Sequence, residues 1–203
     1  MSLVVKALGP LALVEDLGRP GYGHLGVCPS GAADRASHRL ANALVGNAED
    51  AATVEVLLGG LRASVTTDAV IALTGAPAAV NVAGRPVAFG EAVHVRAGDD
   101  IAVGAPTHGL RTYLAVRGGF AVAPALGSRS SDPTTGLGPA PVTVGDELPF
   151  GDDTAGDVPG VDAGTAFVRS GDLLLRAVWG PRDDWFTDEA RAAFTAKAWE
   201  VSA

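Results

Sequence analysis

The sequence predicts a mainly β fold with a few helices. Between residues 3 and 116, short β-prone runs follow one another, and each is ended by Gly, Pro or Asp. Hydrophobic residues make up 47% of the 203 residues and are mostly Ala, Val and Leu, so we expect a core of modest side chains on a β framework. This spacing of short strands is typical of a barrel or a sandwich.

The first two runs are predicted to pair as a hairpin. Residues 3–8 and 11–15 have the composition of strands, and the Gly9-Pro10 dipeptide between them is a turn signal. Further predicted strands cover residues 53–58, 61–65, 69–73, 78–82, 92–95, 101–103 and 112–116. Turn residues bound each of these runs, so strands are expected to dominate the first part of the chain.

Two helices are predicted beside these strands. Ser30 is placed to cap a helix over residues 31–45, where apolar residues recur at helical spacing, and Gly46 is a typical left-handed stop. Near the C-terminus, Thr187 is placed to cap a short helix that extends to about residue 198. Each segment combines a capping side chain with a helix-forming run, which favours helix over strand.

We expect one domain over residues 1–150 and the beginning of a second over residues 172–203. The segment 151–171 starts acidic and rich in Gly, Asp and Pro, a composition that buries little and suits an exposed linker. Beyond it, residues 173–178 are a predicted strand that precedes the short helix. One strand and one helix cannot close a core, so the second unit is expected to be incomplete.

Composition and charge exclude several classes of protein. The formal net charge is −8 at pH 7, which speaks against nucleic-acid binding because contact with phosphates depends on clustered Lys and Arg. No segment offers about 18 uninterrupted apolar residues, so we expect neither a membrane span nor secretion. Cys28 is the only cysteine, which rules out an intrachain disulfide and fits the cytoplasm; we expect its thiol to pack.

Segment 18–34 is the best candidate for a working surface, because it combines many Gly and Pro residues with reactive side chains. Arg19 can bind a substrate carboxylate or brace the loop through carbonyls. His24 suits proton transfer but can also be an ordinary surface residue, and Tyr22 beside it is a candidate substrate contact. Asp34 is a candidate catalytic carboxylate, although the first turn of a helix also favours its charge.

Five polar residues elsewhere complete the candidate site. Arg117 is followed by two glycines at the end of a β-prone strand, which allows either ligand approach or a sharp corner. Ser128 and Arg129 suit anion binding, although such clusters also occur in ordinary loops. We predict these three as substrate contacts. Asn42 and Glu55 lie near apolar stretches and are expected to support the site through buried hydrogen bonds.

Three kinds of binding motif are missing from the sequence. No Gly-x-x-x-x-Gly-Lys-Ser/Thr loop occurs, so ATP would have to be bound by a partner. The four histidines are scattered and no carboxylate cluster has metal-loop spacing, so no metal site is predicted. A biotin attachment of the Met-Lys-Met type is excluded because Met1 is the only methionine, so biotin would arrive on another protein.

A series of spaced motifs resembles one known family. The motifs are Gly18-Arg19-Pro20-Gly21, Pro29-Ser30-Gly31-Ala32-Ala33-Asp34, Leu40-Ala41-Asn42, Leu44-Val45-Gly46-Asn47, Glu55, Leu73-Thr74-Gly75-Ala76, Tyr113-Leu114-Ala115-Val116-Arg117-Gly118-Gly119 and Leu126-Gly127-Ser128-Arg129-Ser130. They occur in the order of the allophanate hydrolase subunit 2 family. That family also includes KipA-like proteins, biotin-dependent carboxyltransferase components and the C subunit of bacterial 5-oxoprolinase.

The resemblance implies a fold, partners and a reaction. It implies a cyclophilin-like β-barrel followed by a second barrel-like unit that begins but does not finish within this sequence. It implies a partner of the KipI or allophanate hydrolase subunit 1 type, with a LamB/YcsF-type subunit as a further partner in 5-oxoprolinases. The expected enzyme opens 5-oxoproline to glutamate at the expense of ATP bound by a partner subunit.

Two other functions are compatible with the same resemblance. One is carboxyl transfer to a small amide or urea from carboxybiotin carried on another protein, as in allophanate hydrolase or urea carboxylase systems. The other is a noncatalytic KipA-type role, in which the chain sequesters a KipI-like inhibitor of a kinase. An enzyme subunit needs Arg19 and His24 for turnover, whereas a sequestering protein needs only its binding surface.

Overall fold

The computed structural model describes residues 1–160 and 174–200. Its contacts divide the chain into two compact units, Met1–Val168 and Arg169–Ala203, which are described separately. The first unit is mainly β, as predicted, and its strands form two antiparallel sheets. None of the described helices is long and apolar enough to cross a membrane.

The larger sheet has six strands in the order β11-β1-β4-β9-β6-β7. Their bounds are Ser2–Ala7 (β1), Arg62–Val65 (β4), Ala78–Val82 (β6), Arg85–Val87 (β7), Asp100–Pro106 (β9) and Glu147–Pro149 (β11). The smaller sheet has five strands in the order β2-β3-β10-β5-β8. Their bounds are Leu11–Glu15 (β2), Thr53–Leu57 (β3), Ala69–Gly75 (β5), Ala92–Val95 (β8) and Arg111–Val116 (β10). Among the described residues the strand pairing gives two open sheets and not one closed ring.

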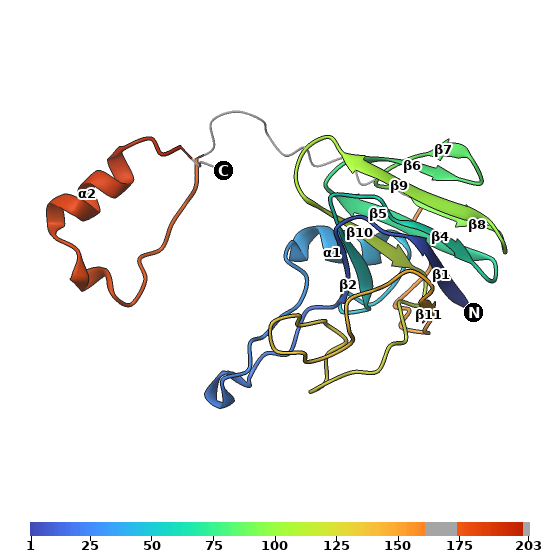
Figure 1. Cartoon of the computed structure of the whole chain (residues 1–203), viewed down its shortest axis with the longest axis horizontal. Helices are drawn as coiled ribbons and strands as arrows, with labels where there is room; N and C mark the ends of the chain where they lie inside the picture. The colour runs from blue at the N-terminus through green and yellow to red at the C-terminus, as the bar shows by residue number, and fades with distance from the viewer. Residues whose placement is uncertain (161–173, 201–203) are drawn as a thin grey trace. The chain divides into compact units, whose positions relative to one another are not determined.

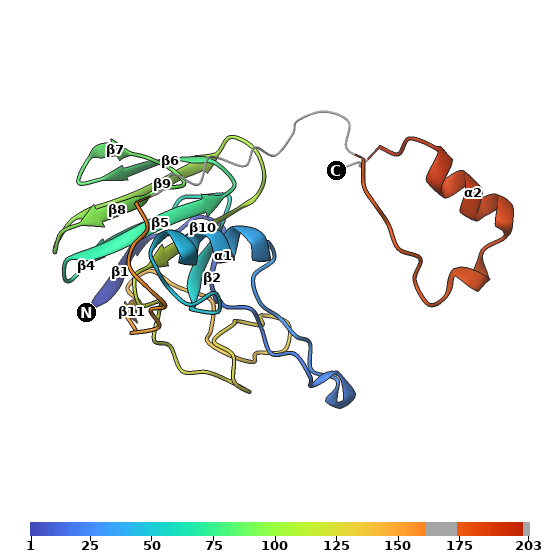
Figure 2. The same cartoon turned by 180° about the vertical axis from the view of Figure 1, so that it is seen from behind.

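Strand β10 shows how the smaller sheet separates two hydrophobic clusters. Leu114 and Val116 belong to the main core, which draws side chains from both sheets, whereas Tyr113 and Ala115 point to the opposite face. Helix α1 (Arg35–Leu44) covers that opposite face, where it contacts β5 and β10 (Figures 1 and 2). The central strands are therefore buried on both sides, and polar residues collect where the loops meet α1.

The predicted hairpin at the N-terminus is wrong, although both of its strands exist. Strand β1 pairs with β4 and β11 in the larger sheet, whereas β2 pairs with β3 in the smaller one. Gly9 lies at the corner between them, where a Cβ would come within 2.1 Å of the Gly59 carbonyl oxygen. The glycine is thus needed for close packing of two backbone segments and not for a hairpin turn.

The first helix begins later than the sequence predicts. Asp34, not Ser30, is its N-cap, and the Asp34 carboxylate accepts hydrogen bonds from the backbone N–H groups of Ala36 and Ser37. Ser30 has a φ of 53° and its hydroxyl accepts a hydrogen bond from Arg19 instead. The predicted end of the helix is confirmed, since Gly46 has a φ of 70° directly after the cap residue Val45.

The first residues of the predicted linker lie against the first unit. The backbone N–H of Gly151 donates to the Gly119 carbonyl at 2.9 Å, and that of Asp153 donates to the Gly118 carbonyl at 3.0 Å. The N–H of Ala155 donates to the Gly46 carbonyl at 2.9 Å. This stretch therefore extends the first unit, while residues 161–171 of the expected linker lie outside the described residues.

The described part of the second unit, residues 174–200, contains a short 3-10 helix η2 (Asp183–Trp185) and helix α2 (Asp188–Ala196). The predicted cap is confirmed, because the Thr187 hydroxyl accepts the N–H of Ala190 at 3.2 Å. The predicted strand over residues 173–178 is wrong for residues 174–178, which form no strand, and residue 173 lies outside the described residues. Among the described residues of this unit, this apolar run has no neighbouring strand to pair with.

Candidate functional site

Segment 18–34 projects from the sheets between β2 and α1 (Figures 1 and 2). At its base the N–H of Arg19 donates to the Pro29 carbonyl at 2.6 Å, and the N–H of Ala32 donates to the Asp16 carbonyl at 2.9 Å. Its outer part contains a short 3-10 helix, η1 (Gly23–Leu25), with no buried residue. The segment is therefore a loop with a joined base and an exposed tip.

His24 and Tyr22 lie at this tip. The His24 side chain is exposed, and its Nδ1 lies 3.1 Å from the Gly21 carbonyl oxygen. Tyr22 is half-buried, and its own carbonyl accepts the N–H of Leu25 at 2.9 Å. Cys28 is exposed as well, so the expectation that its thiol packs is wrong. The proposed roles of His24 in proton transfer and Tyr22 in substrate contact stay predictions.

Arg19 braces the base of this loop from inside the protein. Its side chain is 1% exposed, its Nε donates to the Ala125 carbonyl at 3.2 Å, and its Nη1 donates to the Ser30 hydroxyl at 3.0 Å. Its Nη2 donates to the carbonyl of Ser130. Of the two roles that the sequence allowed, the structure therefore supports bracing, because all three nitrogens are already engaged inside the unit.

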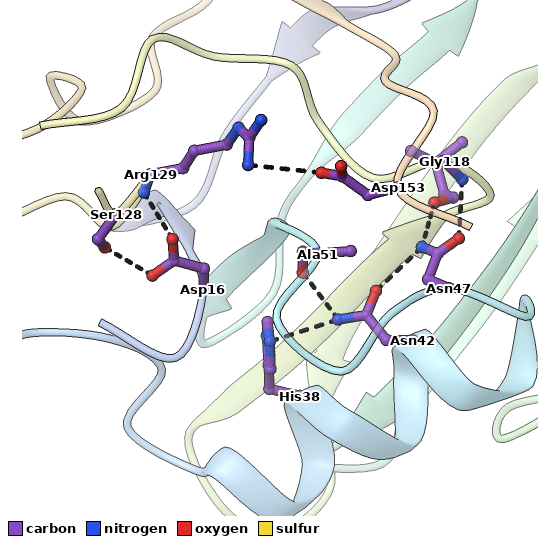
Figure 3. Close-up of polar contacts among 10 residues, drawn as sticks. Asp16, His38, Asn42, Asn47, Ala51, Gly118, Ser128, Arg129 and Asp153 are labelled. Carbon is purple, nitrogen blue, oxygen red and sulfur yellow. Dashed lines mark hydrogen bonds and ion pairs between the residues drawn. The ribbon is translucent and has the colours of Figure 1, made fainter. Parts of the chain in front are cut away.

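Asp16 is the centre of the polar network below the loop, and the sequence did not single it out. Its carboxylate accepts hydrogen bonds from the Ser128 hydroxyl at 2.7 Å and from the backbone N–H of Arg129 at 2.5 Å (Figure 3). It also accepts from the Ser130 hydroxyl at 2.6 Å and from the backbone N–H of Gly18 at 2.7 Å. Three of these donors reach Oδ1 and one reaches Oδ2, so both carboxylate oxygens are hydrogen-bonded. The sequence feature that could have identified Asp16 is its Asp-x-Gly spacing to Gly18, which is typical of a side chain that caps a turn.

The Ser128 side chain and the backbone N–H of Arg129 serve this network. Ser128 is fully buried, and the Arg129 side chain reaches Asp153 at 3.4 Å (Figure 3). The Nε of Arg129 is buried and has no hydrogen-bond partner among the described residues. The Ser128 hydroxyl is already hydrogen-bonded to Asp16. Of the two predicted substrate contacts, Arg129 is therefore the one that we retain.

Glu15 is a second carboxyl that the sequence did not single out. Its side chain is 3% exposed, and its Oε2 has no hydrogen-bond partner among the described residues. Burial raises the pKa of Glu15 from 4.5 to about 8, against the opposing effect of a hydrogen bond to Ser130. Glu15 therefore carries a proton at neutral pH.

Asp34 and Glu55 meet where the loop enters α1. Both carboxylate oxygens of Asp34 accept from the first turn of the helix, including the Ser37 hydroxyl at 2.6 Å. Glu55 accepts from the Tyr113 hydroxyl at 2.8 Å and from the N–H of Ala33 at 3.0 Å, and it pairs with Arg111 at 2.6 Å. Burial raises the pKa of Tyr113, so its hydroxyl remains a donor to Glu55.

Asn42 lies in a separate buried network that connects α1 to the end of β10. Its Nδ2 donates to the Ala51 carbonyl at 2.7 Å and lies 3.3 Å from the Nε2 of His38 (Figure 3). Its Oδ1 accepts from Asn47, whose own Oδ1 accepts the N–H of Gly118 at 2.8 Å. Burial lowers the pKa of His38, which keeps the imidazole neutral in this network.

Arg117 is half-exposed at the end of β10. Its Nη1 donates to the Val45 carbonyl at 2.8 Å and its Nη2 donates to the Gly156 carbonyl at 2.9 Å. A Cβ on Gly118 would lie 2.1 Å from the Gly151 carbonyl oxygen, so the glycine after Arg117 admits a neighbouring chain segment. Arg117 keeps unused donors, because a guanidinium has five N–H groups.

The structure thus places the predicted residues in several different surroundings. Arg19, Ser128 and the backbone of Arg129 share the Asp16 network. Asp34 and Glu55 share the helix entrance, Asn42 shares its network with the loop before β3, and His24 and Tyr22 stand at the exposed tip.

Within the described residues, no group of three or more His, Cys, Asp or Glu side chains is arranged to hold a metal ion. The absence of a metal stays a prediction for the whole chain.

Comparison with known proteins identifies one family. The family described as carboxyltransferase domain, subdomains A and B, matches residues 25–203. The C subunit of the 5-oxoprolinase of Escherichia coli is 34% identical over 205 aligned residues, which include 100% of this chain. The chain spans 65% of the length of that relative. The urea amidolyase of Lachancea kluyveri is 41% identical over 128 residues, which include 63% of this chain and 7% of that enzyme.

Solved structures agree with this result. The crystal structure of TTHA0988 in space group P212121 superposes with a TM-score of 0.75 at 31% identity, covering 95% of this chain and 38% of that one. The Kluyveromyces lactis urea carboxylase superposes with a TM-score of 0.72 at 34% identity, covering 78% of this chain and 15% of that enzyme. The mainly β fold is therefore shared with proteins of this type.

Proposed function

The chain belongs to the carboxyltransferase domain family, subdomains A and B, and from this membership we propose that it is a subunit of a heteromeric, ATP-dependent enzyme that processes a small amide or lactam. The reaction that we propose is that of 5-oxoprolinase, in which the lactam of 5-oxoproline is opened to glutamate. The observation that carries this choice is the similarity to the C subunit of E. coli 5-oxoprolinase over the whole length of this chain. A cytoplasmic location belongs to the same proposal.

The chemistry divides the work between this chain and its partners. Opening the lactam breaks the ring C–N bond and adds water across it, and the hydrolysis of ATP to ADP and phosphate drives this step. ATP would be bound by a partner subunit of the KipI or subunit 1 type, with a LamB/YcsF-type subunit as a further partner. This chain would contribute a cation, Arg117, beside the substrate, and proton transfer from His24, which lies on a separate loop and would have to reach that substrate in the assembled complex. Arg19 is left out of this assignment because its donors brace the loop.

The test is glutamate release from 5-oxoproline and ATP by the chain co-purified with its partner subunits. His24→Gln removes the proton-transfer group from an exposed tip without disturbing the core, so we expect turnover to fall by about 100-fold or more. His108→Gln is the matched control, because His108 is also an exposed loop histidine. Equal turnover in both variants would remove His24 from the mechanism.

Carboxyl transfer is the second candidate, favoured by the 41% identity to a region of the Lachancea kluyveri urea amidolyase. It would use carboxybiotin carried on another protein. An assay with urea, ATP, a biotin carboxylase and a biotin carrier separates the two reactions, since only one of them releases glutamate. A stable complex that turns over neither substrate would instead support the KipA-type sequestering role.

A further inference from the structure

An open groove of about 440 Å³ lies in the first unit, where the ends of β5 and β8 meet the segment after β11. Its walls include Val70, His94, Arg96, Arg117 and Phe150. A groove of this volume falls within the range of small-molecule sites. None of the residues predicted for the loop 18–34 lines it, so it is separate from that loop.

The charge of this groove is opposite to that of the molecule. The chain carries a formal net charge of −8, yet two arginines line the groove, with Asp68 as its one carboxylate side chain among the described residues. The Oδ1 of Asp68 already accepts the N–H of Ala97 at 2.8 Å. Within the described part of the chain Asp68 forms no ion pair with either arginine, so the groove presents cationic donors that its own carboxylate does not neutralise.

The two arginines differ in how they are held. Arg117 is oriented by the Val45 and Gly156 carbonyls, at 2.8 and 2.9 Å, and retains further N–H groups. Arg96 is exposed, its backbone N–H is fixed by the Asp99 carboxylate at 2.9 Å, and its side chain makes no ion pair within the described residues. One guanidinium is thus preorganised and the other is available to close on a ligand.

The remaining walls are apolar. Val70 and Phe150 are partly buried and leave hydrophobic surface beside the cations. A phosphate ion would use only the charges, whereas an organic carboxylate with a compact hydrocarbon body would use both parts of the groove. We propose that this groove binds a small organic carboxylate, with its carboxylate on Arg96 and Arg117 and its hydrocarbon part against Val70 and Phe150.

This inference deepens the proposed function, because 5-oxoproline is such a carboxylate, but its test needs neither ATP nor a partner. The full chain labelled with ¹⁵N is titrated with 5-oxoproline, with 2-pyrrolidinone, which is the same lactam without the carboxylate, and with inorganic phosphate. We expect 5-oxoproline to shift the amide signals of residues 68–70 and 94–96 saturably and to bind at least about tenfold more tightly than either other probe.

A pair of variants locates the site. Arg96→Gln should weaken the binding of 5-oxoproline by about tenfold, whereas Arg85→Gln, an exposed arginine on β7 outside the groove, should leave it unchanged. Four outcomes would each overturn the proposal. They are equal weakening in both variants, binding of 2-pyrrolidinone as tight as that of 5-oxoproline, binding of phosphate as tight as that of 5-oxoproline, and no binding at all. No binding of 5-oxoproline at the groove while the complex still turns it over would overturn this site and leave the proposed reaction standing.

Discussion

Three neighbouring carboxyl groups in and beside β2 and β3 differ in how many hydrogen-bond donors surround them. Asp16 accepts four hydrogen bonds, and Glu55 pairs with Arg111 and accepts the Tyr113 hydroxyl. Glu15 is buried just as deeply, yet its Oε2 has no partner among the described residues. A carboxyl oxygen without a donor is costly to bury in ionised form, so burial raises the pKa of Glu15 to about 8.

The raised pKa of Glu15 predicts how stability depends on pH. The unfolded chain releases this proton near pH 4.5, whereas the folded protein keeps it until about pH 8. Folding therefore takes up a proton between these values, and the contribution of Glu15 to stability falls as pH rises, by roughly 1 kcal/mol per pH unit. Below pH 4.5 both states are protonated and the contribution is fully present.

Glu15→Gln should remove this dependence, because glutamine imitates the protonated carboxyl. We expect the variant and the parent to have similar urea midpoints at pH 5, and the variant to be the more stable at pH 8. Glu91→Gln is the control, since Glu91 is exposed. A stability difference between variant and parent that does not change from pH 5 to pH 8 would contradict the raised pKa of Glu15.

Asp16→Asn tests the centre of the polar network. An amide keeps one acceptor oxygen but sets its NH₂ group against donors that the carboxylate now satisfies, so we expect a loss of roughly 3 kcal/mol in the free energy of unfolding. Asp146→Asn removes a carboxylate that accepts from Thr143 in an exposed turn and should cost less than about 1 kcal/mol. Urea unfolding of both variants at one pH provides the comparison.

At the scale of the elements, capping and catalysis are two separable roles of Asp34. Asp34→Asn keeps an oxygen that can accept the N–H groups of Ala36 and Ser37, so we expect little change in stability, whereas Asp34→Ala should cost about 1 kcal/mol. Thermal unfolding measures this difference. If Asp34 is also catalytic, the asparagine variant will lose turnover in the complex while remaining stable; retained turnover would leave Asp34 as a cap alone.

The misread elements share one physical cause. Ser30 has a good capping side chain, but its hydroxyl is bonded to Arg19, so the helix starts at the next suitable residue. Gly9-Pro10 is a good turn, but β1 and β2 pair with different strands in different sheets, and Gly9 packs closely on Gly59 at the corner between them. In both cases the local signal was correct about the residue, and a contact distant in sequence decided its use.

At the scale of the whole molecule, the two units predict a divisible protein. The main core draws only on residues of the first unit, from Leu3 to Leu148, so we expect a fragment of residues 1–168 to fold on its own. Far-UV circular dichroism and a cooperative urea transition measure this. A fragment that is unfolded in buffer would show that the first unit depends on the remainder of the chain.

The tryptophans report on the second unit only. All three of them, Trp179, Trp185 and Trp199, lie after residue 168, and each is at least 48% exposed in the described structure. We expect their emission to shift to shorter wavelength when partner subunits are added, because burial removes the indole rings from water. Unchanged emission in a complex that forms would place the contact on the first unit.

Residue types alone determined the mainly β fold, nearly all of the strands, the cap at Thr187 and the family, because these depend on local composition and on the order of short motifs. Only the tertiary structure decided the pairing of β1 and β2, the start of α1, the bracing role of Arg19 and the importance of Glu15 and Asp16. Sheet pairing, burial and hydrogen-bond satisfaction join residues that are far apart in sequence. A single sequence carries no direct record of those contacts.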